Sequence, residues 1–398
     1  MSNIILSSSS FPESVAVIGG GRWARVILGE LCKLTASDTN ISIHTQHNTL
    51  NVKKWLREKK LEKRVKLCSK WPTFNTSPSV MIVANAARDH YCSVEYALLS
   101  GVPVLVEKPV SKSANKVKSL IKLAQNSTRT LAAAQVFLFA NYIHRFCNRV
   151  SHLGKPEGLE FHWVDPKNEE RFGENKHYDR GVPVFVDWIP HILPIIKLFF
   201  PKGKVDLTDL KVRKGGAKLT LGLMADGRRC LVKLERNGQK RKRYLSLDIG
   251  QEKVELDFSE EPGTVTWRGE QVSADPTWNF TKKPLSAMLT AFLQASTTGI
   301  FDERLNIESA LQSYVLIDSV RDKYYHQLFP WVEKKITGNQ SENDEVDYSL
   351  TELVSVMEPI YNQELKSRIL ALKSMVLEYG LEVSLKKLGL FDALLCLD

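Results

Sequence analysis

Two ionisable side chains, Asp187 and His191, stand four residues apart in the stretch VPVFVDWIPHILP. On an α-helix, this spacing places a carboxylate and an imidazole on the same face. An imidazole with an ordinary pKa of about 6.5 exchanges protons readily near neutral pH. With Lys108 of VEKPV opposite them, these residues would form a proton-handling cluster. The question is then which elements bring the three side chains together, and what they act upon.

A glycine-rich turn near the start of the chain, SVAVIGGGRWARVILGEL (residues 14–31), could bind a nucleotide. Gly19, Gly21 and Ala24 have the spacing G-x-G-x-x-A. Gly19 permits a tight turn, Gly21 lets the backbone approach a pyrophosphate, and Ala24 allows the helix to pack closely on the strand. The first helical amides would face the phosphates. The pattern predicts a dinucleotide site rather than a loop without a ligand, with contacts from Gly19, Gly20, Gly21, Arg22, Trp23 and Ala24.

The next strand-like run ends without an acidic residue, in ISIHTQHN. Sites that prefer NAD usually place Asp or Glu here, where it accepts hydrogen bonds from the adenosine ribose. Donors stand here instead: His44, Thr45, Gln46, His47 and Asn48. Lys53 and Lys54 follow shortly afterwards. These residues would tolerate or bind a 2′-phosphate, so the sequence favours NADP(H) as cofactor. NAD(H) remains possible, because a solvated loop would select only slightly.

Alternating strand-like and helix-like runs over residues 14–135 must position these groups. Such alternation predicts parallel strands joined by right-handed crossovers, in a doubly wound Rossmann sheet. The expected strands are 14–18, 41–44, 80–84, 102–106 and 130–134. The expected helices are 23–33, 52–60, 91–100 and 114–124. The basic run 53–66 is expected to be a solvated helix face, because Glu58 and Glu62 are mixed with its lysines.

From about residue 155 the pattern changes to consecutive strands. Asp226-Gly227 and Asn237-Gly238 each predict a tight hairpin turn. Helices are expected at 284–296 and 306–326, which gives an α+β domain with a mostly antiparallel sheet. We therefore expect three parts: an NAD(P)-binding Rossmann domain at 1–135, an α+β substrate domain at 136–335, and a linker with a helical C-terminal tail at 336–398.

The segment VMIVANAARDHYCSVEYALLSGVPVLVEKPVS, residues 80–111, resembles the Gfo/Idh/MocA family of glucose–fructose oxidoreductases and inositol dehydrogenases. Residues 84–90, Ala97-Leu98 and Glu107-Lys108-Pro109 match successive parts of the family pattern. The resemblance follows the element order over 14–330 and is strongest at 14–31 and 80–111. It implies nicotinamide-dependent hydride transfer, with Lys108 orienting the nicotinamide and the substrate oxygen. It also implies cofactor contacts from Asn85, His90, Glu107 and Lys108.

The same family carries a D-x-G-x-H motif, to which residues 187–191 are similar. By this resemblance His191 is the general acid/base, and Asp187 contacts the substrate and supports the pair. The chain departs from the motif, because Ile189 replaces the glycine and Trp188 precedes it. These bulky residues indicate an altered pocket. Pro190 directly precedes His191, so a helix that begins there, with Asp187 in the preceding turn, is the alternative arrangement.

Composition limits the classes of partner. The 398 residues carry a net charge of +10 and a pI of about 9.1, which suits an anionic ligand. Signatures of nucleic-acid-binding modules are absent from the sequence, so no nucleic acid is expected. Six scattered cysteines without a CxxC pair indicate no metal site and a cytoplasmic protein. No apolar run reaches the length of a membrane span. We expect a small-molecule substrate and a homo-oligomer formed through the sheet of the substrate domain.

The function favoured by the sequence is an NAD(P)-dependent oxidoreductase. It would transfer a hydride between nicotinamide and a polar carbonyl or hydroxyl compound, such as a sugar or a polyol. One alternative is an NADPH-dependent imine reductase, which the NADPH-like site and the apolar Trp188-Ile189 pair suggest. Another is a non-catalytic protein that senses the cofactor, against which the presence of Lys108, Asp187 and His191 speaks.

Overall fold

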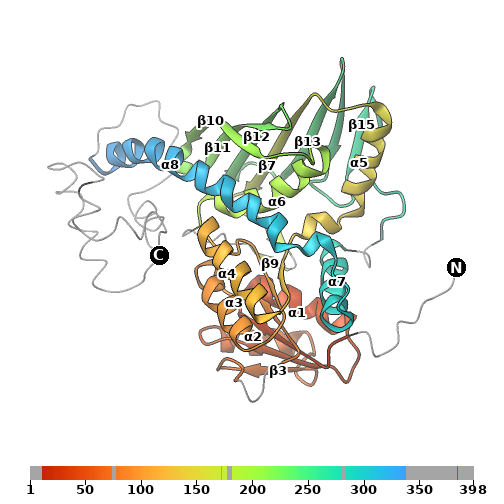
Figure 1. Cartoon of the computed structure of the whole chain (residues 1–398), viewed down its shortest axis with the longest axis vertical. Helices are drawn as coiled ribbons and strands as arrows, with labels where there is room; N and C mark the ends of the chain where they lie inside the picture. Colours follow the sequence, from red (N-terminus) through yellow and green to blue (C-terminus); the bar gives the residue numbers. More distant parts are fainter. Residues whose placement is uncertain are drawn as a thin grey trace. The chain divides into compact units, whose positions relative to one another are not determined.

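The computed structural model describes residues 11–73, 78–171, 173–176, 182–279, 283–337 and 383. The chain divides into two compact units (Figure 1). Unit 1 is formed by Met1–Arg145, Pro190–Ile195 and Asp275–Tyr314, and unit 2 by Phe146–Ile189, Ile196–Ala274 and Val315–Asp398. The domain boundaries expected after residues 135 and 335 stay predictions, although later segments also join the first unit.

Unit 1 contains a six-stranded parallel sheet in the order β3-β2-β1-β4-β5-β6, which confirms the doubly wound Rossmann arrangement. Its strands are β1 Ser14–Ile18, β2 Asn40–His44, β3 Val65–Cys68, β4 Val80–Val83, β5 Val104–Val106 and β6 Leu131–Ala133. Ile18 at the end of β1 pairs with both His44 and Val83. The carboxyl ends of these strands therefore meet at one edge, where open α/β sheets bind ligands.

Amphipathic helices cover the sheet of unit 1. They are α1 Arg22–Leu34, α2 Thr49–Glu58, α3 His90–Leu99, α4 Ala114–Ser127 and α7 Pro284–Thr298, with the short helices η3 Ala87–Asp89, η4 Val136–Phe139 and η6 Glu303–Leu305. Helix α1 buries Ala24, Ile27, Leu28 and Leu31, at the spacing of one helix face. Figure 1 shows α3 beside α4 and α1 near α7, and both pairs are in contact. Met288 and Phe292 of α7 lie in the same core as α1.

Unit 2 is built on an eight-stranded sheet in the order β10-β11-β12-β7-β13-β14-β15-β16. The strands are β7 Gly158–Pro166, β10 Val205–Arg213, β11 Lys218–Ala225, β12 Arg228–Gly238, β13 Lys242–Ile249, β14 Glu252–Asp257, β15 Thr264–Trp267 and β16 Glu270–Ser273. Strands β8 Glu170–Arg171 and β9 Glu174–Asn175 form a separate small ribbon, and η5 spans Lys214–Gly216. The β7–β12 pair is parallel and the others are antiparallel, which confirms the mostly antiparallel sheet.

Three helices have most of their residues in unit 2: α5 Asn141–Leu153, α6 Val184–Phe199 and α8 Ile307–Thr337. Strand β7 turns alternate residues inward, so that Phe161 and Trp163 are buried. The ring of Trp163 lies 6.2 Å from that of Trp188 on α6. Phe185 on the same helix lies 4.8 Å from Tyr324 of α8, measured between ring centroids. Aromatic packing thus fixes α6 between the sheet and α8.

One of the two expected hairpins is wrong. Asp226 and Gly227, with φ of 50° and 74°, join β11 to β12 as predicted. The expected hairpin at Asn237-Gly238 does not form, because strand β7 lies between β12 and β13 and pairs with both. Asn237 does have a positive φ of 58°, but the chain then passes across the end of β7 instead of turning back on β12.

Two other expectations need correction or fall outside the described residues. The basic run 53–66 is not one helix face, since α2 ends at Glu58 and β3 begins at Val65. Of the expected linker and helical tail at 336–398, the structure describes only the end of α8 and Val383. Among the described helices, none has the length and apolar character needed to cross a membrane.

Candidate active site

The glycine turn between β1 and α1 has the shape that a pyrophosphate requires. Gly19 has a φ of 129°, and a Cβ there would lie 2.5 Å from the carbonyl oxygen of Ala84, so only glycine fits beside β4. A Cβ at Gly21 would meet nothing within 4 Å among the described residues. Gly21 caps α1, whose described first turn has neither an acidic residue nor a side-chain cap. Anionic ligands bind well at such a helix start.

The middle glycine of the turn packs against the end of β2. A Cβ on Gly20 would lie 2.5 Å from Oγ1 of Thr45, and this hydroxyl accepts a hydrogen bond from the Asn48 amide at 3.3 Å. Arg25 donates through Nη1 to the Gly20 carbonyl at 2.9 Å. Thr45 and Arg25 therefore hold the turn in shape, while Gln46 and His47 are exposed just beyond it.

His44 is not available as a donor to the cofactor, which corrects the expectation for this residue. It is buried, with Nδ1 2.6 Å from the Lys70 carbonyl and Nε2 2.9 Å from Oγ of Ser42. Burial lowers the pKa of His44, so the ring is held neutral. The ring ties β2 to the segment after β3 and thereby brings Lys70 to the carboxyl edge of the sheet.

The segment after β5 contains Glu107, Lys108 and Pro109, with a cis peptide bond before the proline. His90 lies behind it, 2% exposed, with Nδ1 2.7 Å from the Pro109 carbonyl and Nε2 3.2 Å from the Asn85 carbonyl. Burial lowers the pKa of His90, so the ring is neutral. A neutral imidazole donates through only one nitrogen. Because the distance from Nδ1 to its acceptor is the shorter one, we assign Nδ1 as the donor. The expected cofactor contact of His90 is thus corrected to a tie between two loops.

Asn85 has an acceptor that the protein leaves unused. Its Nδ2 donates to Oγ of Ser93 at 2.8 Å, whereas its buried Oδ1 accepts no hydrogen bond from the described residues. The backbone of Asn85 borders Gly19. An orphaned acceptor beside the glycine turn is what a ligand with hydrogen-bond donors would satisfy. This atom and the open position at Gly21 show that the residues present fit a dinucleotide.

Glu107 is directed into the protein. It is 7% exposed, and burial raises its pKa although a hydrogen bond from the Trp23 side chain and the charge of Lys108 oppose this. The neighbouring Val110 amide donates to the Tyr314 hydroxyl at 2.8 Å. Trp23 and Glu107 therefore connect the glycine turn to the segment that carries Lys108, which is a different role from direct cofactor contact.

His191 lies on a continuous helix with Asp187, as expected, so the alternative arrangement with a helix start at Pro190 is wrong. Helix α6 begins at Val184 and contains both Pro190 and Pro194, which places Asp187 in its first turn and His191 one turn later. His191 lies in the part of α6 that belongs to unit 1, and its ring is 5.2 Å from that of Phe137, edge to face. Phe137 lies in η4, just after β6, and β6 pairs with the strand that precedes Lys108. Lys108 and His191 thus belong to one unit.

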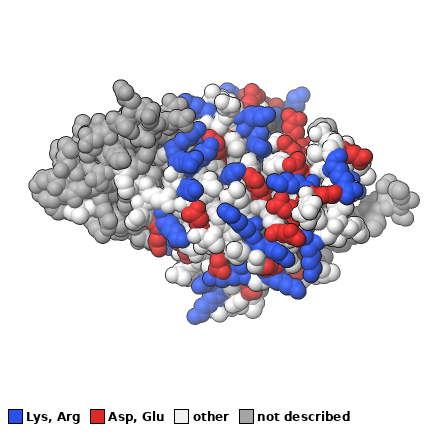
Figure 2. Space-filling view, turned by 90° about the horizontal axis from the view of Figure 1, so that it is seen from above, with Lys and Arg blue, Asp and Glu red and all other residues white. Residues whose placement is uncertain are grey.

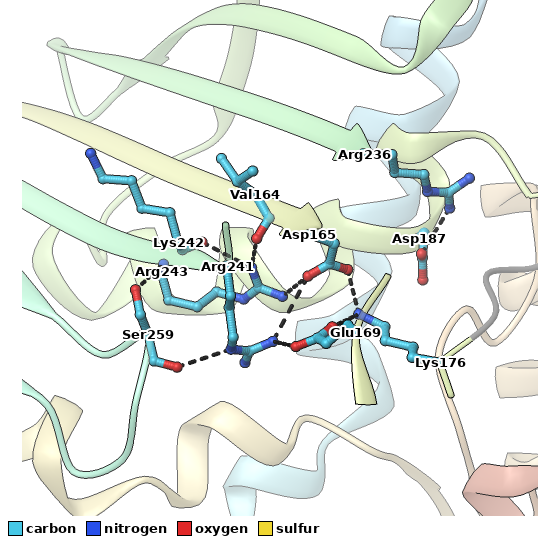
Figure 3. A network of polar contacts seen from close by, with 10 residues as sticks. All are labelled: Val164, Asp165, Glu169, Lys176, Asp187, Arg236, Arg241, Lys242, Arg243 and Ser259. Carbon is cyan, nitrogen blue, oxygen red and sulfur yellow. Dashed lines mark hydrogen bonds and ion pairs between the residues drawn. The ribbon is translucent and has the colours of Figure 1, made fainter. Parts of the chain in front are cut away.

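Asp187 has a partner that sequence reasoning missed. Nη2 of Arg236 lies 2.8 Å from its Oδ2, and Nη1 donates to the Val182 carbonyl at 2.9 Å (Figure 3). The Arg236 side chain is 7% exposed. The available signal was strand alternation, because Arg236 continues the inward positions of Val232 and Leu234 on β12.

Trp188 and Ile189 belong to the core. Each is 3% exposed. Arg236 lies over the Trp188 ring, with 5.8 Å from its Cζ to the ring centroid. Packing in the core explains the size of these residues, and the altered pocket expected from them stays a prediction.

The surface charge is mixed in sign. Figure 2 shows Lys and Arg side chains interspersed with Asp and Glu on the face in view. Within the basic run 53–66, Lys54 lies 3.8 Å from Glu58 and Arg57 lies 3.2 Å from Glu62.

Among the described residues, no group of His, Cys, Asp and Glu is arranged to hold a metal ion.

Comparison with known proteins finds a family model that matches part of the chain. Residues 14–135 match the model of the oxidoreductase family with an NAD-binding Rossmann fold, GFO_IDH_MocA. The fold and the site define an NAD(P)-binding oxidoreductase. The match covers the Rossmann part of the chain, which is thus similar to the NAD-binding domain of that family. No protein of curated function matches its sequence.

Solved structures share the fold at low sequence identity. UDP-N-acetylglucosamine 3-dehydrogenase GnnA from Acidithiobacillus ferrooxidans is 17% identical, with a TM-score of 0.63 over 79% of this chain and 98% of that one. KijD10, a 3-ketoreductase from Actinomadura kijaniata in complex with NADP and TDP-benzene, is 16% identical, with a TM-score of 0.65 over 78% and 97%. An oxidoreductase from Agrobacterium radiobacter in complex with NAD+, L-tartaric acid and magnesium is 16% identical, with a TM-score of 0.61 over 79% and 96%.

Proposed function

We propose that this oxidoreductase transfers a hydride between a nicotinamide cofactor and a polar carbonyl or hydroxyl compound of the sugar or polyol class. The observation that carries the proposal is the position of His191. Its ring contacts Phe137, next to the sheet edge that also carries Lys108 and the glycine turn. Among the similar structures, GnnA is by name a UDP-N-acetylglucosamine 3-dehydrogenase and KijD10 a 3-ketoreductase, which supports this substrate class.

Lys108, His191 and Phe137 have different roles around the substrate oxygen. When bound, the cofactor supplies the hydride for reduction of the carbonyl carbon, or accepts it in the reverse direction. The ammonium of Lys108 orients the substrate oxygen and stabilises negative charge on it. The imidazole of His191 donates a proton to that oxygen during reduction and removes it during oxidation. Phe137 packs edge-on against the imidazole and limits its rotation.

The amide groups at Gly21 and Arg22 would hold the pyrophosphate, and Asn85 Oδ1 would accept a hydrogen bond from the cofactor. We also propose a preference for NADP(H). The end of β2 has no carboxylate, and Lys70 is exposed at the same edge, where the His44 ring holds its backbone. Lys70 thus adds a cation near the expected 2′-phosphate, beside the exposed Gln46 and His47.

The preference predicts a selective loss of affinity in Lys70→Glu. This variant should weaken NADPH binding about tenfold or more and leave NADH binding within about twofold, because only NADPH carries the 2′-phosphate. Nicotinamide fluorescence titration gives both Kd values without a substrate. Lys118→Glu, an exposed change on α4 with the same change in net charge, is the matched control. Equal Kd values for NADPH and NADH in the unchanged protein would contradict the preference.

The substrate class is tested by turnover on a defined panel. The full chain is incubated with UDP-N-acetylglucosamine, glucose, myo-inositol or a cyclic imine, and the nicotinamide absorbance is followed. We expect turnover with a sugar or polyol. Turnover with the imine alone would favour the imine reductase, which keeps the NADPH-like site as its support although Trp188 and Ile189 are buried. Cofactor binding without turnover on any compound would favour the non-catalytic sensor.

A further inference from the structure

Helix α6 has no side-chain cap at its start among the described residues, and two prolines interrupt its helical hydrogen bonds. Its N-cap residue is Pro183, and no side chain of the described residues caps the helix there. Pro190 and Pro194 have no amide hydrogen, so the carbonyl groups four residues earlier, at Val186 and Pro190, receive no helical hydrogen bond from them. The Asp187 amide still donates to the Pro183 carbonyl at 3.0 Å, but the turns around Pro190 and Pro194 have fewer helical hydrogen bonds than a regular helix, so contacts from outside can add to their support.

Arg236 supplies such contacts at two points. One arm of its guanidinium binds the carbonyl of Val182, just before the helix, and the other binds the Asp187 carboxylate in the first turn. Figure 3 shows this pair to one side of a larger charged network around Asp165. The arginine itself is fixed, because its amide donates to the Ala217 carbonyl at 2.8 Å and Trp188 lies beneath its side chain.

The pairing also limits what the Asp187 carboxylate can do. A guanidinium remains protonated under all ordinary conditions, so Arg236 cannot transfer a proton. A carboxylate that accepts a hydrogen bond from a buried guanidinium is stabilised in its ionised form, which makes it a weak proton carrier near neutral pH. Asp187 is 21% exposed and Arg236 is 7% exposed, so the pair is largely shielded from water.

We propose that Asp187 and Arg236 act as one positioning pair, which fixes the first turn of α6 and so the orientation of His191. In this role Asp187 holds Arg236 in place through their ion pair, and it does not transfer a proton to or from the substrate. The proposal rests on the proposed function in one respect, the assignment of His191 as the acid/base group.

Three variants of the full chain test the pair: Asp187→Asn, Arg236→Gln and the double variant. With UDP-N-acetylglucosamine as probe, each single change should lower kcat by about 100-fold, the cost of a displaced catalytic group. The KM for NADPH should stay within about twofold. The double variant should be no slower than the slower single variant, because residues that act as a unit are not additive. A much larger loss in Asp187→Asn than in Arg236→Gln would overturn the proposal, since it would mark Asp187 as a proton-transfer group.

Two further variants separate positioning from general damage. Arg241→Gln removes an arginine of the connection between β12 and β13 that pairs with Glu169, and it should leave kcat unchanged. Arg236→Lys keeps the charge but loses the fork that binds two acceptors, so its kcat should fall between those of the unchanged protein and Arg236→Gln. A fully active Arg236→Lys would contradict a role for the two-point contact.

A spectroscopic readout keeps the test independent of turnover. In the full chain, the imidazole resonance of His191 is identified by its absence in His191→Ala. Asp187→Asn and Arg236→Gln should shift this resonance in the same direction, and Arg241→Gln should leave it in place. If no panel compound is turned over but the resonance shifts, the proposed function fails and the positioning pair stands. An unmoved resonance in both variants overturns the pair.

Discussion

Single residues of the site are held by buried polar contacts whose energetics depend on pH. Glu107 is the strongest case, because its carboxyl group lies inside the protein between Trp23 and the backbone of Lys108. Burial raises its pKa above the ordinary value of 4.5. A carboxyl group with a raised folded-state pKa favours folding at low pH, and that contribution is lost as the pH rises through the folded pKa.

Glu107→Gln should therefore stabilise the protein at pH 7, by about 1 kcal/mol. The amide stays neutral, and its oxygen can still accept the hydrogen bond from Trp23. The advantage should shrink below about pH 4.5, where both proteins are neutral at this position. Urea unfolding at the two pH values measures the difference. A variant that is less stable than the parent at pH 7 would show that the ionised carboxylate is well compensated.

The residues of the site were predictable from sequence to different degrees. Gly19, Lys108 and His191 stand in local patterns, so spacing and family resemblance located them without a structure. Arg236 and Lys70 reach the site through pairing between distant segments, and neither lies in a local motif. His44 and His90 matched the expected types, but their burial, which sequence does not reveal, gives them structural roles.

At the scale of elements, the sheet of unit 2 depends on a buried charged network. Asp165 on β7 pairs with Arg243 on β13 and with Lys176, the latter at 2.5 Å (Figure 3). Burial alone would raise the pKa of Asp165, but these cations overcome it and hold the value at about 2. Arg243 is 2% exposed and lies over the Trp163 ring, 3.9 Å from its Cζ to the ring centroid.

Asp165→Asn should destabilise the protein by about 3 to 5 kcal/mol, because it leaves a buried guanidinium without its carboxylate. In the unchanged protein, the contribution of Asp165 is complete above about pH 4 and is lost as the pH falls toward 2. Urea unfolding measures both effects. Asp206→Asn, on the exposed edge strand β10, is the control and should change stability little. Equal stability of the two variants would contradict a role for the network.

Elements with strong periodicity were predictable, and those decided by distant pairing were not. The strands β1 and β2 and the helices α1 and α4 follow their patterns closely. Strand β3 was missed because four residues at the edge of a sheet carry little alternation. The Asn237-Gly238 turn has the correct local chemistry, but only the insertion of β7 decides where the chain goes next. Helix α6 continues through two prolines because tertiary packing supports it.

At the scale of the molecule, a Rossmann unit and a second sheet unit carry the groups of an NAD(P)-binding oxidoreductase. Residues 190–195 are far from the Rossmann strands in sequence and yet belong to unit 1, which brings His191 into the unit that carries Lys108. Homo-oligomer formation through the sheet of unit 2 stays a prediction, which the mass of the full chain in solution, measured by light scattering, decides.

We propose that Lys108 and His191 act on the substrate while the glycine turn holds the cofactor. The most direct measurement compares hydride transfer and NADPH binding in the unchanged protein, Lys108→Ala and His191→Ala, with the panel compound that is turned over fastest. We expect a loss of kcat of at least about 100-fold in each variant, with the Kd for NADPH within about threefold of that of the unchanged protein. Unchanged turnover in both variants would contradict the proposal.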